Sequence, residues 1–416
     1  MIHREASRHL WRTVFWVSFP FGILSFVLPI YSRELGATAL EVGALFTVMS
    51  FGPVVVRPFL GRALDRWGRR PFLVLGLGAY VVSMLLFTLA WTVRTLTLAR
   101  FTQGWGDAFL WLTAYTIVAD LALEEDRGHT FGQIDEAYYR GAILGSLVGF
   151  GVLFAFRRAG HSLSETWPWL FALYTLSALV ALWFGWRGVP ETRPQNRAPV
   201  ESRPLSGQLL ALMGIVFITG ASGMMVWPLL MLFLQDSLGA GTEQLAMAYL
   251  PAALVSSFLP SRTGRIADRW GRKGPMIVGL VIGALASALI PSLRNLFLLA
   301  FLWLLESVGY CISLPAERAF VADIAGEDTR GTSYGLYTFA YFLGAMVGPL
   351  AGGWLYDAVG QVAPFYLNAG VLSLGALLVG LVLKESRPAG AEFVPSPPSF
   401  GVADQENRLG ERRYTG

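Results

Sequence analysis

The apolar residues of this 416-residue chain fall in long uninterrupted runs, not at the spacing of helices that line a water-soluble core. A run of about 20 residues crosses about 30 Å of hydrocarbon as a helix, and only helices satisfy their own backbone there. The pattern predicts an all-α membrane protein with twelve transmembrane helices. Their expected ranges are 11–31, 40–61, 72–91, 95–123, 132–156, 167–186, 208–234, 243–264, 275–293, 295–323, 333–357 and 363–384.

The composition agrees with this pattern and excludes several classes of protein. Hydrophobic residues make up 54% of the chain and charged residues 14%, against about 25% charged residues in soluble domains. The single cysteine, Cys311, excludes a disulfide scaffold and a cysteine-rich metal cluster. The chain has no Walker-type glycine loop, no metal-spaced histidine pair and no nucleophile–base set. We therefore expect no enzyme activity, no cofactor and no metal.

The basic residues are distributed unequally between alternate loops. With the amino terminus inside, 24 of the 32 Lys and Arg residues fall in segments expected on the cytoplasmic side, and five fall in outer loops. Because cytoplasmic loops carry the excess of Lys and Arg, both termini are expected in the cytoplasm. We expect a multi-pass protein of the plasma membrane, in a bacterium the inner membrane. The same asymmetry explains the net charge of +4 without a nucleic-acid partner.

The chain contains an internal repeat. GRALDRWGRR begins at Gly61 and GRIADRWGRK at Gly264, 203 residues later, and the same offset aligns Asp120 with Asp323. Each half has an even number of spans, so the halves are expected to be related by an axis along the membrane normal. We predict two six-helix bundles at 1–187 and 208–385, a cytoplasmic linker at 188–207 and a disordered tail at 386–416. We expect the protein to act as a monomer.

The sequence GRALDRWGRR resembles the signature loop between helices 2 and 3 of the major facilitator superfamily, and the resemblance extends over nearly the whole chain. It implies a secondary transporter that works by alternating access, with Asp65, Arg69 and Asp120 forming a cytoplasmic latch that holds the outward-open state. From the residues alone, the glycines permit close helix approach and a tight turn, and the arginines bind carboxylates or lipid phosphates. The alternative is that these residues only fix topology. The proposed latch residues are Gly61, Asp65, Arg66, Gly68, Arg69, Arg70 and Asp120, repeated as Gly264, Asp268, Arg269, Gly271, Arg272 and Asp323.

Two further motifs are similar to those of this family. RFTQGWGD, from Arg100, resembles its helix 4 motif, so Arg100 either takes part in the transport cycle or extends to the membrane surface. The glycines of span 11, Gly344, Gly348 and Gly352, resemble the motif of the drug:proton antiporter branch, although that branch carries it on helix 5. Their spacing also suits close helix packing.

Charged residues inside the predicted spans are the candidates for substrate and proton binding. By rise per residue, Asp107 on span 4 and Arg140 on span 5 reach nearly the same height. Because either charge alone in the bilayer costs about 3 kcal/mol, we predict that they pair. Glu136 is a competing partner one turn away and Asp135 is adjacent; a purely structural ion pair is the alternative. Arg57 is expected near the cytoplasmic surface, with no transport role.

Glu306 on span 10 has no Lys or Arg opposite it on span 11. A carboxyl buried without a cation favours its neutral form, which suits a proton carrier, and Tyr310 lies on the same helix face. Few charges in an aromatic-rich cavity indicate export of a lipophilic or amphipathic small molecule in exchange for protons. Alternatives are symport of a small polar metabolite, lipid flipping, or a membrane receptor that transports nothing.

Overall fold

The computed structural model describes residues 2–121, 127–193, 206–239, 241–259, 271–324 and 330–386. Within these ranges the chain forms helices and no strand. Three predicted latch residues, Gly264, Asp268 and Arg269, lie outside the described residues, as does the predicted tail beyond Ser386.

The described helices make twelve membrane crossings, as the apolar runs predict. In the first half they are α1 (Ile2–Val17) and α2 (Phe19–Glu34), then α3 (Ala39–Trp67), α4 (Arg70–Thr88), α5 (Val93–Leu121), α6 (Arg127–Arg158) and α7 (Leu163–Gly188). In the second half they are α8 (Gly207–Leu238), α9 (Thr242–Phe258), α11 (Lys273–Leu289) with the 3-10 turn η2 (Ile290–Ser292), α12 (Leu296–Ile324), α13 (Arg330–Ala358) and α14 (Ala363–Val382). Helices α1 and α2 together form one crossing, interrupted at Ser18.

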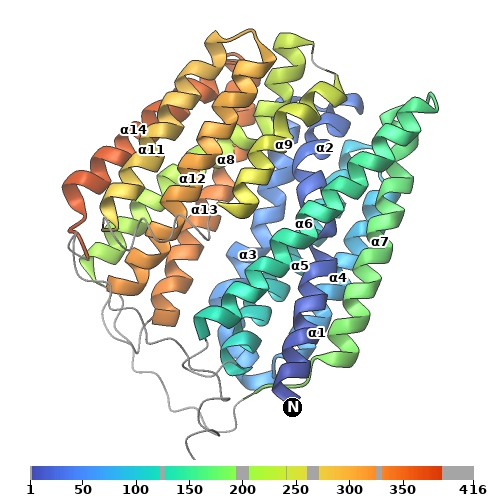
Figure 1. The fold of residues 1–416 in the computed structure, drawn as a ribbon, viewed down its shortest axis with the longest axis vertical. Helices are drawn as coiled ribbons and strands as arrows, with labels where there is room; N and C mark the ends of the chain where they lie inside the picture. Colours follow the sequence, from blue (N-terminus) through green and yellow to red (C-terminus); the bar gives the residue numbers. More distant parts are fainter. Residues whose placement is uncertain are drawn as a thin grey trace, which may run out of the picture.

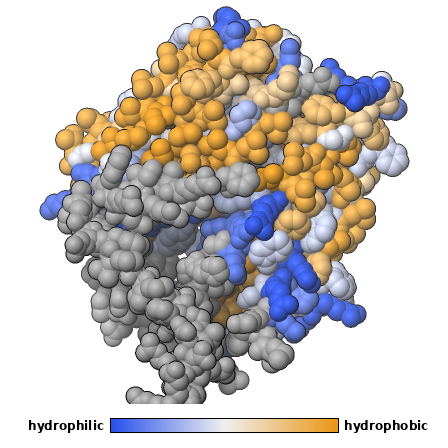
Figure 2. Space-filling view, in the orientation of Figure 1, coloured by the Kyte–Doolittle hydropathy of each residue, from blue (hydrophilic) through white to orange (hydrophobic). Residues whose placement is uncertain are grey.

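Ten segments of the described chain are long and apolar enough to span a membrane by composition alone. The other two crossings, α5 and α9, complete the set. Apolar side chains form a broad belt across the visible face of the molecule, with hydrophilic residues towards its two ends (Figure 2). Large apolar side chains such as Phe59, Trp169 and Leu381 are exposed, because they face lipid rather than water.

Columns of small residues bring pairs of helices together in both halves. A Cβ at Gly141 or Gly145 of α6 would overlap the backbone of Phe15 in α1 or Phe19 in α2. A Cβ at Gly348 of α13 would overlap the carbonyl group of Ala221 in α8 in the same way. The equivalent helices of the two halves therefore pack by the same small-residue contact, as the repeat predicts.

The two halves meet along α3 and α13 and along α2 and α8. Figure 1 shows the two groups of helices approaching one another at the top and diverging toward the amino terminus. We call the end that holds the amino terminus and the loop Trp67–Arg70 the basic end. The opposite end holds the loops Leu35–Thr38 and Val359–Val362.

Candidate functional site

Arg69, directly before α4, is completely buried at the basic end. Its Nε donates to Asp120 (2.9 Å), its Nη2 to Asp65 (2.9 Å) and its Nη1 to the carbonyl oxygen of Leu64 (2.8 Å). A buried guanidinium is tolerated when its N–H groups are paired in this way. The structure therefore brings together the three first-half residues that the sequence analysis selected, and they join α3, α4 and α5.

The glycines and arginines around Arg69 differ in their surroundings. Gly68 has a φ of +92°, and a Cβ there would overlap the carboxylate of Glu191. Gly61 faces open space, so the expectation that it permits close helix approach is wrong. Arg66 is exposed and lies over the ring of Trp67, while Nη2 of Arg70 donates to the carbonyl oxygen of Trp186 (2.8 Å).

Glu191 completes this network, although the sequence analysis did not select it. Its carboxylate accepts from the backbone N–H groups of Arg69 (2.8 Å) and Arg70 (3.1 Å), at the start of α4. A carboxylate at this position satisfies unpaired N–H groups and opposes the positive end of the helix dipole. The next residue, Thr192, donates to Asp120 (3.2 Å). The segment that follows α7 is thereby fastened to the loop between α3 and α4.

The second half repeats this arrangement in the residues that are described. Nε of Arg272 donates to Asp323 (2.9 Å), and Glu385 accepts from the backbone N–H groups of Arg272 (2.8 Å) and Lys273 (3.1 Å). Ser386 donates to Asp323 (3.0 Å), as Thr192 does to Asp120. Gly271 has a φ of +85°, like Gly68.

Glu191 and its counterpart Glu385, which the sequence analysis did not select, have a recognisable sequence signal. The segments PETR from Pro190 and KESR from Lys384 are alike, but their residue numbers differ by 194 instead of 203. An ungapped comparison of the two halves at a constant offset therefore overlooks them.

Asp107 does not pair with Arg140, so this prediction is wrong. Its Oδ2 lies 3.7 Å from Nη2 of Arg57, and its Oδ1 accepts from the hydroxyl of Tyr80 (3.2 Å). Arg140 pairs instead with Glu136, its predicted competing partner, and its side chain is 63% exposed. Equal height on neighbouring helices did not determine which faces meet.

Arg57 is largely enclosed, with a side chain 16% exposed, although it was expected to extend to the surface. Helix α3 continues to Trp67, so Arg57 lies ten residues, or about 15 Å, from the end of the helix. Its guanidinium carbon lies 4.0 Å from the ring centroid of Phe342 on α13, and its buried Nε has no hydrogen-bond partner in the part of the chain that the structure describes. Arg57 thus connects an ion pair of the first half to an aromatic ring of the second.

Arg100 is also buried, at 3% exposure, which excludes the interpretation that it extends to the membrane surface. Its Nη1 donates to Gln103 (2.8 Å) and to the sulfur of Met49 (3.0 Å), and its guanidinium lies over the ring of Phe46. Within the described ranges no carboxylate pairs with it. Its role in transport remains a prediction.

Glu306 lies in the middle of α12, half-buried, and forms no ion pair or hydrogen bond with the described residues. Tyr310, one turn further on, is 53% exposed, and Tyr139 of α6 and Tyr341 of α13 lie close enough to influence its ionisation. The exposed face of α12 is therefore turned to the space between the two halves. Asp135, on α6, accepts from the hydroxyl of Tyr115 (2.7 Å).

At the opposite end, two carboxylates of the second half bind donors of the first. Asp236 accepts from Arg33 (3.2 Å) and from the hydroxyl of Tyr356 (3.0 Å). Asp357 accepts from the backbone N–H groups of Ala39 (3.2 Å) and Leu40 (2.8 Å), at the start of α3. Behind them, the ring of Phe26 lies against Tyr249, with centroids 5.4 Å apart. We call these contacts the seal of the opposite end.

Comparison with known proteins agrees with this architecture. A model of the Major Facilitator Superfamily matches residues 10–291 and 212–409. Multidrug resistance protein 1 of Bacillus subtilis is 24% identical over 86% of this chain and 91% of its own length. The class E tetracycline resistance protein of Escherichia coli is 28% identical over 87% and 90%. The quinolone resistance protein NorA of Staphylococcus aureus is 24% identical over 91% and 96%.

Solved structures share the fold at low sequence identity. The human organic anion transporter MFSD10 superposes with a TM-score of 0.67 at 20% identity, over 91% of this chain and 99% of that chain. A bacterial homologue of the human lysosomal transporter Spinster, in an inward-facing and unoccupied conformation, superposes with a TM-score of 0.68 at 14% identity, over 91% and 95%. The family match spans more than half of the chain, so this protein belongs to the Major Facilitator Superfamily and is a multi-pass membrane transporter rather than an enzyme.

Proposed function

We propose that this transporter exports lipophilic or amphipathic small molecules in exchange for protons, by alternating access of a site between its two halves. The names of its bacterial relatives, which refer to resistance to multiple drugs, tetracycline and quinolones, support this substrate class. We further propose that it resides in a bacterial plasma membrane with the basic end and both termini in the cytoplasm, which the 24-to-5 distribution of Lys and Arg supports.

The observation that carries the proposal is the environment of Glu306. Trp303, one turn before it, lies against Trp227 and Tyr249, with ring centroids 6.5 Å and 5.5 Å apart. A carboxyl beside aromatic rings, without a basic partner among the described residues, can bind either a proton or a cationic, apolar substrate. Competition between these two ligands for one group is sufficient to couple their opposite movements.

The Arg57–Asp107 pair takes the place of the predicted Asp107–Arg140 pair as the second candidate for coupling. We propose that protonation of Asp107 releases Arg57, whose other contact is Phe342 of the opposite half. The contacts around Arg69 join elements of the first half. These contacts therefore support a stabilising role within that bundle. The proposed role as a latch between conformational states rests on the resemblance of the motif to that of the family.

The test is substitution of Glu306 in purified protein reconstituted in proteoliposomes. We expect Glu306→Gln to abolish proton movement driven by ethidium, read from an internal pH-sensitive dye, because an amide carries no exchangeable charge at this site. Glu34→Gln, the same chemical change at an exposed position of the opposite end, is the control and is expected to keep wild-type exchange. Unchanged ethidium–proton exchange in Glu306→Gln would exclude Glu306 as the proton carrier.

A further inference from the structure

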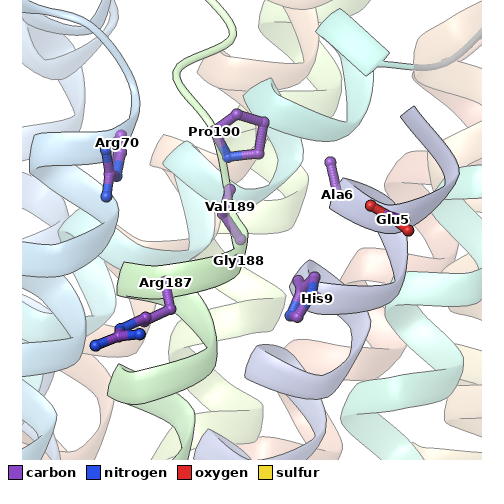
Figure 3. A pocket seen from close by; sticks show the side chains of 8 residues that line it. All are labelled: Glu5, Ala6, His9, Arg70, Arg187, Gly188, Val189 and Pro190. Carbon is purple, nitrogen blue, oxygen red and sulfur yellow. The ribbon is translucent and has the colours of Figure 1, made fainter. Parts of the chain in front are cut away.

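A hollow of about 290 Å³ lies at the basic end of the first bundle. It is lined by Glu5, Ala6 and His9 of α1, by Arg70 at the start of α4, and by the segment Arg187–Pro190 at the end of α7. Figure 3 shows this segment passing between α4, which carries Arg70, and α1, which carries His9. Three separate elements therefore form its wall.

The side chains that line this hollow are mainly basic. Arg70 donates one N–H group to the carbonyl oxygen of Trp186, and its other N–H groups are available to a ligand. Arg187 is exposed and makes no hydrogen bond with the described residues. The Nδ1 atom of His9 is buried and has no hydrogen-bond partner among the described residues. One carboxylate, Glu5, lies at the rim, so the hollow combines two guanidinium groups and an imidazole with a single acidic group.

The hollow lies at the level expected for lipid headgroups. Trp183 and Trp186, on the last two turns of α7, are 53% and 56% exposed. Exposed tryptophans followed by arginine at a helix end mark the boundary between hydrocarbon and headgroups. A ligand held by Arg187 could therefore extend its apolar part along these indole rings without entering water.

We propose that this hollow binds the phosphodiester headgroup of an anionic membrane lipid. Arg70 and Arg187 provide charge-assisted hydrogen bonds to phosphate oxygens, and basic pockets between membrane helices are suited to such headgroups. Free phosphate offers the same charge but has no acyl chains to lie against the two tryptophans. This site is separate from the space between the two halves that the transported molecule would occupy.

A bound lipid would also act on the network around Arg69. Arg70 follows Arg69 directly, and Arg187 lies four residues before Glu191, whose carboxylate holds the start of α4. A headgroup that bridges Arg70 and Arg187 therefore fastens the end of α7 to the loop between α3 and α4. We expect bound lipid to stabilise the first bundle.

The proposal is tested by thermal unfolding of the purified full-length protein in detergent, with phosphatidylglycerol, phosphatidylcholine or inorganic phosphate added. Phosphatidylglycerol is expected to raise the melting temperature of the wild type by several degrees, and the other two additives are not. Arg187→Gln is expected to lose at least half of this increase. Arg187 makes no hydrogen bond within the described structure, so its replacement leaves the fold intact. Arg158→Gln, at an exposed arginine of the opposite end, should respond like the wild type.

Four results would overturn the proposal. An equal response of Arg187→Gln and wild type to phosphatidylglycerol would show that the lipid binds elsewhere. An equal response to inorganic phosphate would show that the occupant is a soluble anion. If phosphatidylglycerol did not change the melting temperature of the wild type, the hollow would not be a binding site for this lipid. Arg70→Gln, measured in parallel, should show the same loss as Arg187→Gln, and a full response of this variant would equally contradict the site.

Discussion

Arg57 and Asp107 form a long ion pair. Their closest atoms are 3.7 Å apart, which is longer than a charge-assisted hydrogen bond. The Nε of Arg57 has no hydrogen-bond partner among the residues described. Tyr80 provides Asp107 with a second contact, and Phe342 provides Arg57 with one from the other half. A pair held this loosely is expected to exchange partners more readily than the closely bonded Arg69.

A double-mutant cycle tests whether this pair is a stabilising contact. Asp107→Asn leaves the mostly buried Arg57 without its counter-charge, so we expect the free energy of unfolding to fall by about 3 kcal/mol. Arg57→Gln with Asp107→Asn should recover about 1 to 3 kcal/mol of the loss expected from adding the single effects. The measurement is thermal unfolding in detergent, followed by tryptophan fluorescence. Strict additivity would mean that the two charges do not interact in the folded protein.

The loop between α3 and α4 illustrates how a motif can assign the same role to residues that differ physically. Gly61 and Gly68 belong to one motif, and sequence reasoning assigned both to close approach or turning. In the structure Gly68 has φ +92° and ψ 170° against the carboxylate of Glu191, whereas Gly61 is a helical residue beside open space. The positive φ was predictable from a glycine between two helices. The contact with Glu191 was not, because it depends on where the segment after α7 returns.

The two glycines provide a matched pair of substitutions. Gly68→Ala is expected to lower the free energy of unfolding by about 1 to 3 kcal/mol, because its backbone conformation suits glycine and its new methyl group would displace Glu191. Gly61→Ala is expected to raise it by up to about 1 kcal/mol, because alanine favours a helix interior. Both are read from the melting temperature in detergent. Equal effects of the two substitutions would contradict the assigned geometry.

At the scale of the whole molecule, the apolar runs and the repeat were sufficient to predict the all-helical fold. They were sufficient because lipid permits only structures that satisfy their own backbone. Side-chain partners were not predictable in the same way. The height of Asp107 is set by its place along α5, but its partner depends on helix rotation and on where α3 ends. The predicted domain boundaries at 187 and 208 remain predictions, and most of the segment between them lies outside the described residues.

The seal of the opposite end consists of contacts between the two halves. Arg33 and Asp236 occupy equivalent positions of the repeat, 203 residues apart, with opposite charges. Such a pair lies where the two halves face one another across their common axis. Asp357 adds an acceptor for the start of α3, where the helix dipole favours a negative charge. Both contacts join the two halves, so we expect both to break when this end opens.

We therefore expect Asp236→Asn with Asp357→Asn to shift the population toward opening at the opposite end. The amide removes the ion pair with Arg33 and leaves one acceptor oxygen in place of two at the start of α3.

The single native cysteine, Cys311, is buried, so spin labels can be placed at Arg158→Cys and Phe297→Cys, which are exposed on the two halves at this end. Pulsed electron paramagnetic resonance should show a longer distance population in the double variant than in the parent or in Glu34→Gln. If the double variant and the parent gave the same distribution, the two carboxylates would contribute nothing to closure, and apolar contacts, such as that of Phe26 with Tyr249 and the packing of α13 on α3, would hold the end shut.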